Sequence, residues 1–187
     1  MSLLEFFTWL AETPGSIALR ESFYMYTIVE SIHVWALALF VGFTVLFDLR
    51  LLGWALGHVP VSTTAQRQLP WMIAGFAVMM ISGALLLYAI PLRTYHSVFF
   101  RLKLLLLVLA GLNAGIFHVT VFRKVADWDM TVVTPRRARL AGAASLVLWT
   151  CIIFSGRMIA YNWFDCDIQP QSDFINWAAG CVVPPAE

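Results

Sequence analysis

Charged residues are scarce in this chain, and their scarcity separates it from soluble proteins. Only 12% of the 187 residues are Asp, Glu, Lys or Arg, whereas 60% are hydrophobic and the mean hydropathy is +0.79. Soluble domains carry about twice that charged fraction. The formal net charge of +1 leaves no basic surplus for a phosphate backbone. The composition excludes a soluble globule, a disordered regulator and a nucleic-acid binder, and predicts an integral membrane protein.

The apolar runs lack the alternation of apolar and polar residues that marks transmembrane β-strands. Four runs are long enough to cross a bilayer as helices, at about residues 24–47, 71–90, 100–122 and 140–161. A shorter helical pattern over 2–13 stops at Pro14 and predicts an interfacial helix. We therefore expect one all-α transmembrane domain over 1–187. It is a four-helix bundle in the lipid bilayer, with a short N-terminal interfacial helix and a tail at 162–187.

Basic residues outside the spans are concentrated on one side of the bundle. The first and third connections contain Arg50, Arg67, Arg123, Lys124, Arg136, Arg137 and Arg139. Cytoplasmic connections carry such an excess of Lys and Arg. Both termini are therefore predicted to face the outer side of the membrane.

Cysteine occurs at three positions, and two of them, Cys166 and Cys181, lie in the tail. The predicted orientation puts this tail in an oxidising compartment, where a disulfide persists. We expect a bridge between Cys166 and Cys181, the alternative being two free thiols. Cys151 falls inside the fourth span, where packing is its expected role.

Acidic residues are missing from the last three predicted spans, which argues against a binuclear carboxylate metal site within one subunit. The first span has Glu30 and His33, three residues apart and so on one helix face. The arrangement Glu-x-x-His supplies ligands in di-metal bundles, but only with carboxylates from other helices. The structural alternative for Glu30 is an ion pair with Lys103 or Arg157, which are predicted at a similar depth.

His33 is the strongest candidate for a cofactor ligand. Ionisable side chains inside spans are costly and mark functional sites. An interior imidazole with cations nearer the surface is the arrangement that holds a b-type haem, with nitrogen on the iron and Lys103 or Arg157 on the propionates. The alternative is a histidine that hydrogen-bonds a carbonyl group.

His118 is the other histidine within a span, and straight helices put it about 15 Å from His33 in depth. The two side chains are therefore poor partners for one iron. A five-coordinate haem on His33, a second haem on His118 and a purely structural His118 all stay open. His58 and His96 fall in connections, where solvated side chains are the expectation.

Short motifs in the first three spans resemble a known group of bacterial membrane proteins. Glu30-Ser31-Ile32-His33, Asp48-Leu49-Arg50-Leu51-Leu52-Gly53 and Phe100-Arg101-Leu102-Lys103-Leu104 are similar to segments of HemJ-type protoporphyrinogen oxidases and CopD-type copper proteins. The resemblance implies the bacterial inner membrane and b-type haem at His33, with Lys103 as the second inherited position. It also implies copper as the alternative metal.

Three functions follow as hypotheses. The first is a haem-binding membrane redox protein in electron transfer, with a quinone-like or porphyrin-like partner, which includes the option of a membrane oxidoreductase. The second is a copper-handling protein using Met79, Met80 and Met158. The third is a non-catalytic structural subunit. Small residues at Gly75, Gly83, Ala141 and Ser145 allow close helix packing, within the bundle or in a homo-oligomer.

Overall fold

The computed structural model describes residues 2–129, 134–161, 163–164 and 166–181, and all regular elements in these ranges are helical. The long helices are α3 (Met25–Leu52), α4 (Val61–Ala89), α6 (Val98–Thr120) and α7 (Arg136–Tyr161). The short ones are α1 (Leu3–Ala11), α2 (Pro14–Glu21), α5 (Pro91–His96), the 3-10 helix η1 (Phe122–Asp127) and α8 (Asp173–Ala179). The predicted all-α class is confirmed.

The four long helices are long and apolar enough to cross a membrane, as predicted. The shortest, α6, has 23 residues and is about 34 Å long, which exceeds the ~30 Å hydrocarbon core. Three predicted boundaries differ from the observed ones by four residues or more, and one of them is the start of α7 at Arg136 instead of residue 140. Helix α3 continues past residue 47 to Leu52, and α4 begins at Val61 and runs through Pro70 instead of starting at residue 71. Polar residues in these added turns lower the local hydropathy, so the apolar runs end early in the sequence pattern.

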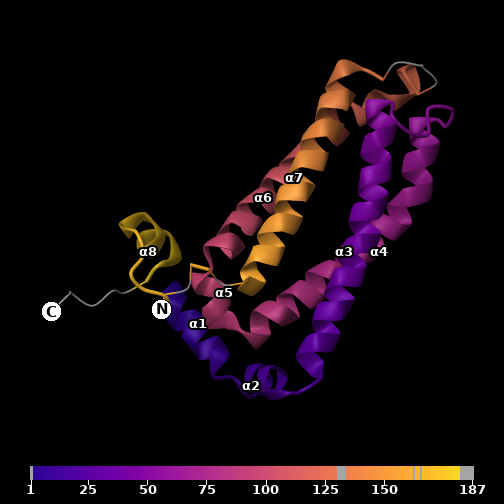
Figure 1. The fold of residues 1–187 in the computed structure, drawn as a ribbon. Coiled ribbons are helices and arrows are strands. Elements are labelled where there is room, and N and C mark those ends of the chain that lie inside the picture. The colour runs from indigo at the N-terminus through magenta and orange to yellow at the C-terminus, as the bar shows by residue number, and fades with distance from the viewer. Residues whose placement is uncertain (1, 130–133, 162, 165, 182–187) are drawn as a thin grey trace.

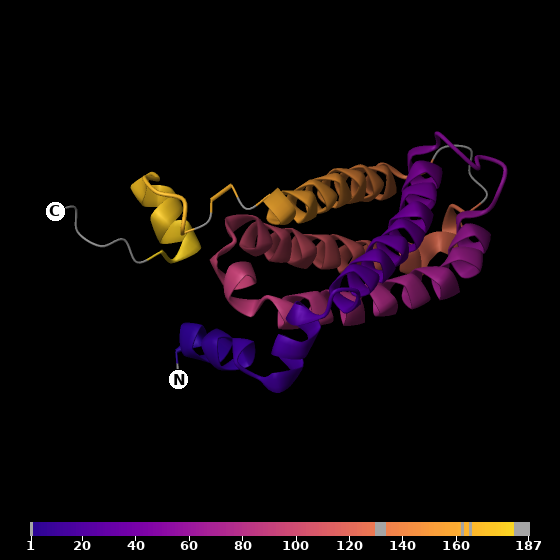
Figure 2. The ribbon, with the colours of Figure 1, turned by 60° about the horizontal axis from the view of Figure 1, so that its bottom comes forward.

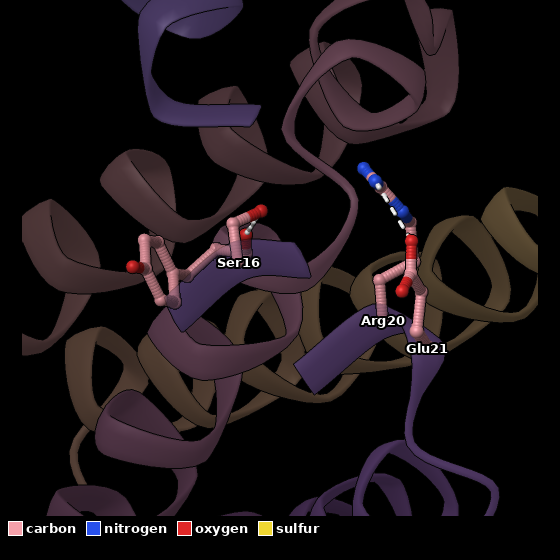
Figure 3. Close-up of polar contacts among 4 residues, drawn as sticks. Ser16, Arg20 and Glu21 are labelled. Atoms are coloured by element: carbon pink, nitrogen blue, oxygen red, sulfur yellow. Dashed lines mark hydrogen bonds and ion pairs between the residues drawn. The ribbon is translucent and has the colours of Figure 1, made fainter. Parts of the chain in front are cut away.

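The N-terminal segment forms two short helices where one was predicted. In α1, Ser2 and Glu5 form a reciprocal cap at the helix start. Pro14 lacks a backbone N–H and occupies the first turn of α2, where no donor is needed. The Ser16 hydroxyl of α2 then donates 2.7 Å to the Tyr88 carbonyl near the end of α4 (Figure 3). A Cβ at Gly15 would collide with the Tyr88 hydroxyl, so glycine permits this close approach.

The long helices pack in the order α4, α3, α7, α6, because α3 contacts both α4 and α7 and α6 contacts α7. Helices α1, α2, α5 and α8 gather at one end of the bundle, and η1 and the α3–α4 connection lie at the opposite end (Figures 1 and 2). All four long helices contribute to the central apolar cluster, which consists of Ala36, Met79, Ala110, Trp149 and Ile152. A second cluster lies toward η1 and contains Leu51, Val61, Val121, Trp128 and Ala138.

Large apolar side chains cover the outside of the long helices. Trp35 is 77% exposed, Ile81 65% and Val147 63%. Such a surface is unsuited to water and suited to lipid tails. The chain is therefore a multi-pass membrane protein with transmembrane helices.

Candidate functional site

The His33 side chain lies between α3 and α4 and is half-buried. Its ring packs against Gly83 of α4, where an added Cβ would lie 3.1 Å from the ring atom Cε1. Any larger residue at position 83 would therefore press on the imidazole. Glycine at this position lets the two helices approach closely around the ring.

A chain of two hydrogen bonds orients the His33 ring. Nδ1 of His33 lies 3.0 Å from the Ser82 hydroxyl oxygen. The single hydroxyl hydrogen of Ser82 is donated to the Val78 carbonyl at 2.6 Å, with the Met79 carbonyl at 3.2 Å. With the Ser82 hydrogen on the Val78 carbonyl, Ser82 accepts from His33 and Nδ1 carries the proton, and the ring also has a hydrogen bond to the backbone of Met79.

The other ring nitrogen, Nε2, then carries a lone pair in the neutral imidazole. No donor to Nε2 is found among the residues that the structure describes. A histidine oriented through one nitrogen, with the other nitrogen basic, has the arrangement of a metal ligand.

Lys103 approaches this region from α6. Its ammonium group is close enough to the His33 ring for a direct electrostatic interaction. On α7, Gly156 leaves room for it, since an added Cβ would lie 3.7 Å from the Lys103 Nζ atom. The half-buried ammonium has no ion pair or hydrogen bond within the described part of the chain. An unpaired cation thus lies within electrostatic reach of a neutral, oriented histidine.

Glu30 and Arg157 are two further predicted site residues. The structural alternative for Glu30 was an ion pair with Arg157 or Lys103. The Glu30 and Arg157 side chains are both exposed. The Arg157 guanidinium lies over the Tyr161 ring, 5.2 Å from its centroid, and Glu30 interacts electrostatically with Tyr26. All three partners are described by the structure, and no ion pair joins Glu30 to Arg157 or Lys103.

The remaining histidines are distributed over both ends of the molecule. His118 is exposed near the end of α6 and stacks on the Phe122 ring at 5.5 Å, so it belongs neither to the core nor to the His33 region. His58 is exposed in the α3–α4 connection. His96 donates from Nδ1 to the Ala179 carbonyl at 3.0 Å. Only His33 is oriented between two long helices.

Helix α8 docks onto the bundle end through its last carbonyl groups. The Arg101 guanidinium donates to the carbonyls of Ala178 and Ala179, and His96 also binds the latter. Cationic donors at a helix C-terminus complement its dipole. A disulfide joins Cys166 to Cys181 and closes this segment, as the sequence predicted.

Sequence reasoning identified His33 and missed its partner. Ser82 reads as a small residue within an apolar run, and only the α3–α4 register brings its hydroxyl to the ring. It also missed Asp48, which was treated as part of a connection and is buried inside α3. The signal available for Asp48 was a lone acid between Phe47 and Leu49, two apolar residues.

The described residues include no group of three or more His, Cys, Asp or Glu side chains that could hold a metal ion. Two of the methionines considered for copper lie in different environments. Met79 packs in the central cluster, whereas Met80 is 49% exposed on the outside of α4. What the geometry offers is a single nitrogen ligand with a neighbouring cation.

Comparison with known proteins places the chain in one family. No curated protein and no solved structure matches it significantly. The resemblance to HemJ-type and CopD-type proteins therefore stays a prediction. A family model described as DUF6644, a family of unknown function, matches residues 6–162, a stretch that contains all four long helices. The chain belongs to the DUF6644 family.

Proposed function

We propose that this protein is a b-type haem-binding membrane protein that transfers electrons, with His33 as the axial ligand of the iron. The observation that carries the proposal is the bond from His33 Nδ1 to Ser82. It leaves Nε2 as the basic nitrogen, and haem proteins hold iron through a histidine oriented in this way.

Lys103 supplies the second element of the proposal. A haem has two propionate groups, and a buried carboxylate needs a cationic partner. The unpaired ammonium of Lys103, near His33, meets that need. Arg157 is the secondary candidate, because its guanidinium is exposed and already contacts Tyr161. Glu30 is not needed to orient the ring, since Ser82 does so.

The proposal is for one haem on His33, not two. His118 is exposed and contacts Phe122, which supports a role on the outer surface of α6. His33 would then be the one ligand that the described part of the chain supplies, and a further ligand would come from another copy of the chain. Gly75, Gly83 and Gly142 all meet α3 within the same chain. Self-association is proposed chiefly because the ligand set within one chain is incomplete.

We place the protein in the bacterial inner membrane with both termini on the outer side. The basic first and third connections support this orientation. So does the position of the disulfide-closed α8 at the same end as α1 (Figure 1). The His33 and Lys103 region then lies in the outer half of the bilayer, where an electron partner such as a quinone can approach through lipid.

An absorption spectrum and a metal analysis of the purified protein in mild detergent test the proposal. We expect a Soret band and iron in about equal amount to protein. Copper without a Soret band would support the copper-handling hypothesis and overturn ours. Absence of both metals after expression with adequate haem supply would leave a structural subunit as the better account.

A further inference from the structure

A second polar region lies inside the bundle, far from His33. Asp48 is fifteen residues after His33 on α3, about 22 Å along the helix axis. Its side chain is only 4% exposed. Gly142 of α7 makes this burial possible, since an added Cβ would lie 3.2 Å from the Asp48 carbonyl oxygen. The acid is thus enclosed where α3 and α7 touch.

No basic residue in the described part of the chain forms an ion pair with Asp48. Arg50 is close in sequence, but side chains two positions apart leave a helix in different directions. Arg50 donates from Nε to the Val59 carbonyl at 2.7 Å instead. Ser145 of α7 is the side-chain hydrogen-bond partner that faces the carboxyl group. The oxygen Oδ2 is fully buried and has no partner among the residues that the structure describes.

Gln68 of α4 adds a second unsatisfied oxygen to the same region. Its side chain is 8% exposed, and its buried Oε1 also has no partner in the described structure. Two contacts between α3 and α4 show which part of α3 lies opposite Gln68. Gly75 meets α3 at Ala36 and Phe40, and Val61 shares a buried cluster with Leu51. Gln68 lies midway between these two contacts and so faces α3 near Thr44, one turn before Asp48.

Two more oxygens border this turn. Thr44 is buried one turn before Asp48 and donates its hydroxyl hydrogen to the Phe40 carbonyl, so its oxygen keeps lone pairs for another partner. Asn113 of α6 donates its amide to the Ala141 carbonyl at 3.0 Å, so its own carbonyl oxygen also stays an acceptor. Ala141 lies one turn from Ser145. The oxygens of this region thus outnumber the hydrogen bonds found for them, and no cation is paired with Asp48 among the residues that the structure describes.

We propose that Asp48, Gln68 and Ser145 form an intramembrane binding site for an exchangeable monovalent cation, a proton or an alkali metal ion. A buried carboxylate without a cationic partner is costly, so we expect one positive charge to accompany it. Carboxylate, amide and hydroxyl oxygens are the ligands that hard cations prefer. With one carboxylate, a single positive charge balances the site, whereas a divalent ion would leave an excess.

The test uses the full chain in detergent or nanodiscs. Thermal unfolding is measured in NaCl and in choline chloride at equal ionic strength. Infrared spectra are recorded for the protein and for Asp48→Asn, whose side chain has the same size without a charge. Asp127→Asn, a change at an exposed acid beyond the spans, is the matched control.

Either of two results supports the site and identifies its occupant. A saturable rise in Tm of about 4 °C with sodium, lost in Asp48→Asn and kept in Asp127→Asn, indicates an alkali ion. A protonated-carboxyl band at neutral pH that Asp48→Asn removes, without a sodium effect, indicates a proton. In the first case, Gln68→Leu weakens sodium binding at least tenfold. In the second, it shifts the band because the proton loses an acceptor.

An ionised Asp48 at neutral pH, combined with the same Tm in sodium and choline, would overturn the proposal. This outcome is read on the wild-type protein, so it does not depend on whether a variant folds. Haem binding at His33 is unaffected by it.

Discussion

Nδ1 of His33 lies 3.0 Å from the hydroxyl oxygen of Ser82, a residue 49 positions later in the sequence. This contact favours Nε2 as the basic ring nitrogen, because the Ser82 hydroxyl also lies within hydrogen-bond distance of the Val78 carbonyl as a donor. Sequence spacing alone relates His33 to Glu30 on the same helix. The fold instead relates it to a serine on the next helix.

Ser82→Ala removes the acceptor that orients His33. We expect haem affinity to fall about 10- to 100-fold, the usual effect of losing the group that holds a ligating histidine. Haem titration of the apoprotein, followed by absorbance, measures the change. Ser31→Ala is the control, since that hydroxyl bonds only to the Thr27 carbonyl on the exposed face of α3. Equal affinities for the two variants would show that the contact has no role in ligation.

Reduction of the Cys166–Cys181 bridge should loosen α8 without unfolding the spans. The bridge joins residues 15 positions apart, and closing a loop of that length stabilises the closed form by about 3 kcal/mol. Amide hydrogen exchange in 173–179 should therefore accelerate about 100-fold, while the long helices exchange as before. Cys151→Ser serves as a control for thiol effects. Alkylation of both tail cysteines without a reductant would contradict the bridge itself.

Asp129 should make the start of α4 sensitive to acid. Its carboxylate accepts from the backbone N–H of Ser62 at 2.8 Å and from the Ser62 hydroxyl. Burial tends to raise the pKa of Asp129, but these hydrogen bonds outweigh it and hold the pKa below its ordinary value. The contribution to stability is therefore complete above about pH 4 and is lost as pH falls through the lowered pKa.

Asp129→Asn tests this capping contact. We expect a loss of about 1 kcal/mol at neutral pH, typical of a helix cap, together with a flatter dependence of stability on pH below 4. Unfolding followed by circular dichroism over pH 2.5 to 7 measures both. If stability falls below pH 4 in the variant as steeply as in the wild type, another group causes the acid sensitivity.

The topology prediction is open to reporter fusions. Fusions after Arg67 and Arg136 should report the cytoplasm, and fusions at either end of the chain should report the outer compartment, because basic connections are retained inside. A cytoplasmic tail would reverse the orientation and remove the compartment argument for the disulfide.

The spans were predictable because lipid demands about 20 apolar residues in each helix, a constraint that composition reveals directly. The short helices were harder. Helix α5 comprises six residues beginning at Pro91, and α8 depends on contacts with Arg101, so neither carries a periodic pattern of its own. The end of α3 was placed too early because Asp48 and Arg50 interrupt the apolar run, although both are buried.

Part of the candidate site could likewise be predicted from the sequence, and part could not. His33 and Lys103 stand out in a sequence because ionisable groups are rare in spans. Their partners do not, since Ser82, Gly83 and Gly156 are common residues in packed membrane helices. Depth estimates suggested that Glu30 and Arg157 share a level. Rotation around the helix axes, which depth estimates ignore, directs both side chains outward.

The most direct test of the central claim is the Soret absorbance of His33→Ala relative to the wild type, with His58→Ala as the matched histidine control. If His33 ligates haem iron, the first variant should lose most of the Soret band and the bound iron, and the second should keep both. Folding of His33→Ala is checked by its elution as a single species with wild-type helical content. Full haem content with an unchanged spectrum in His33→Ala would contradict the proposed site.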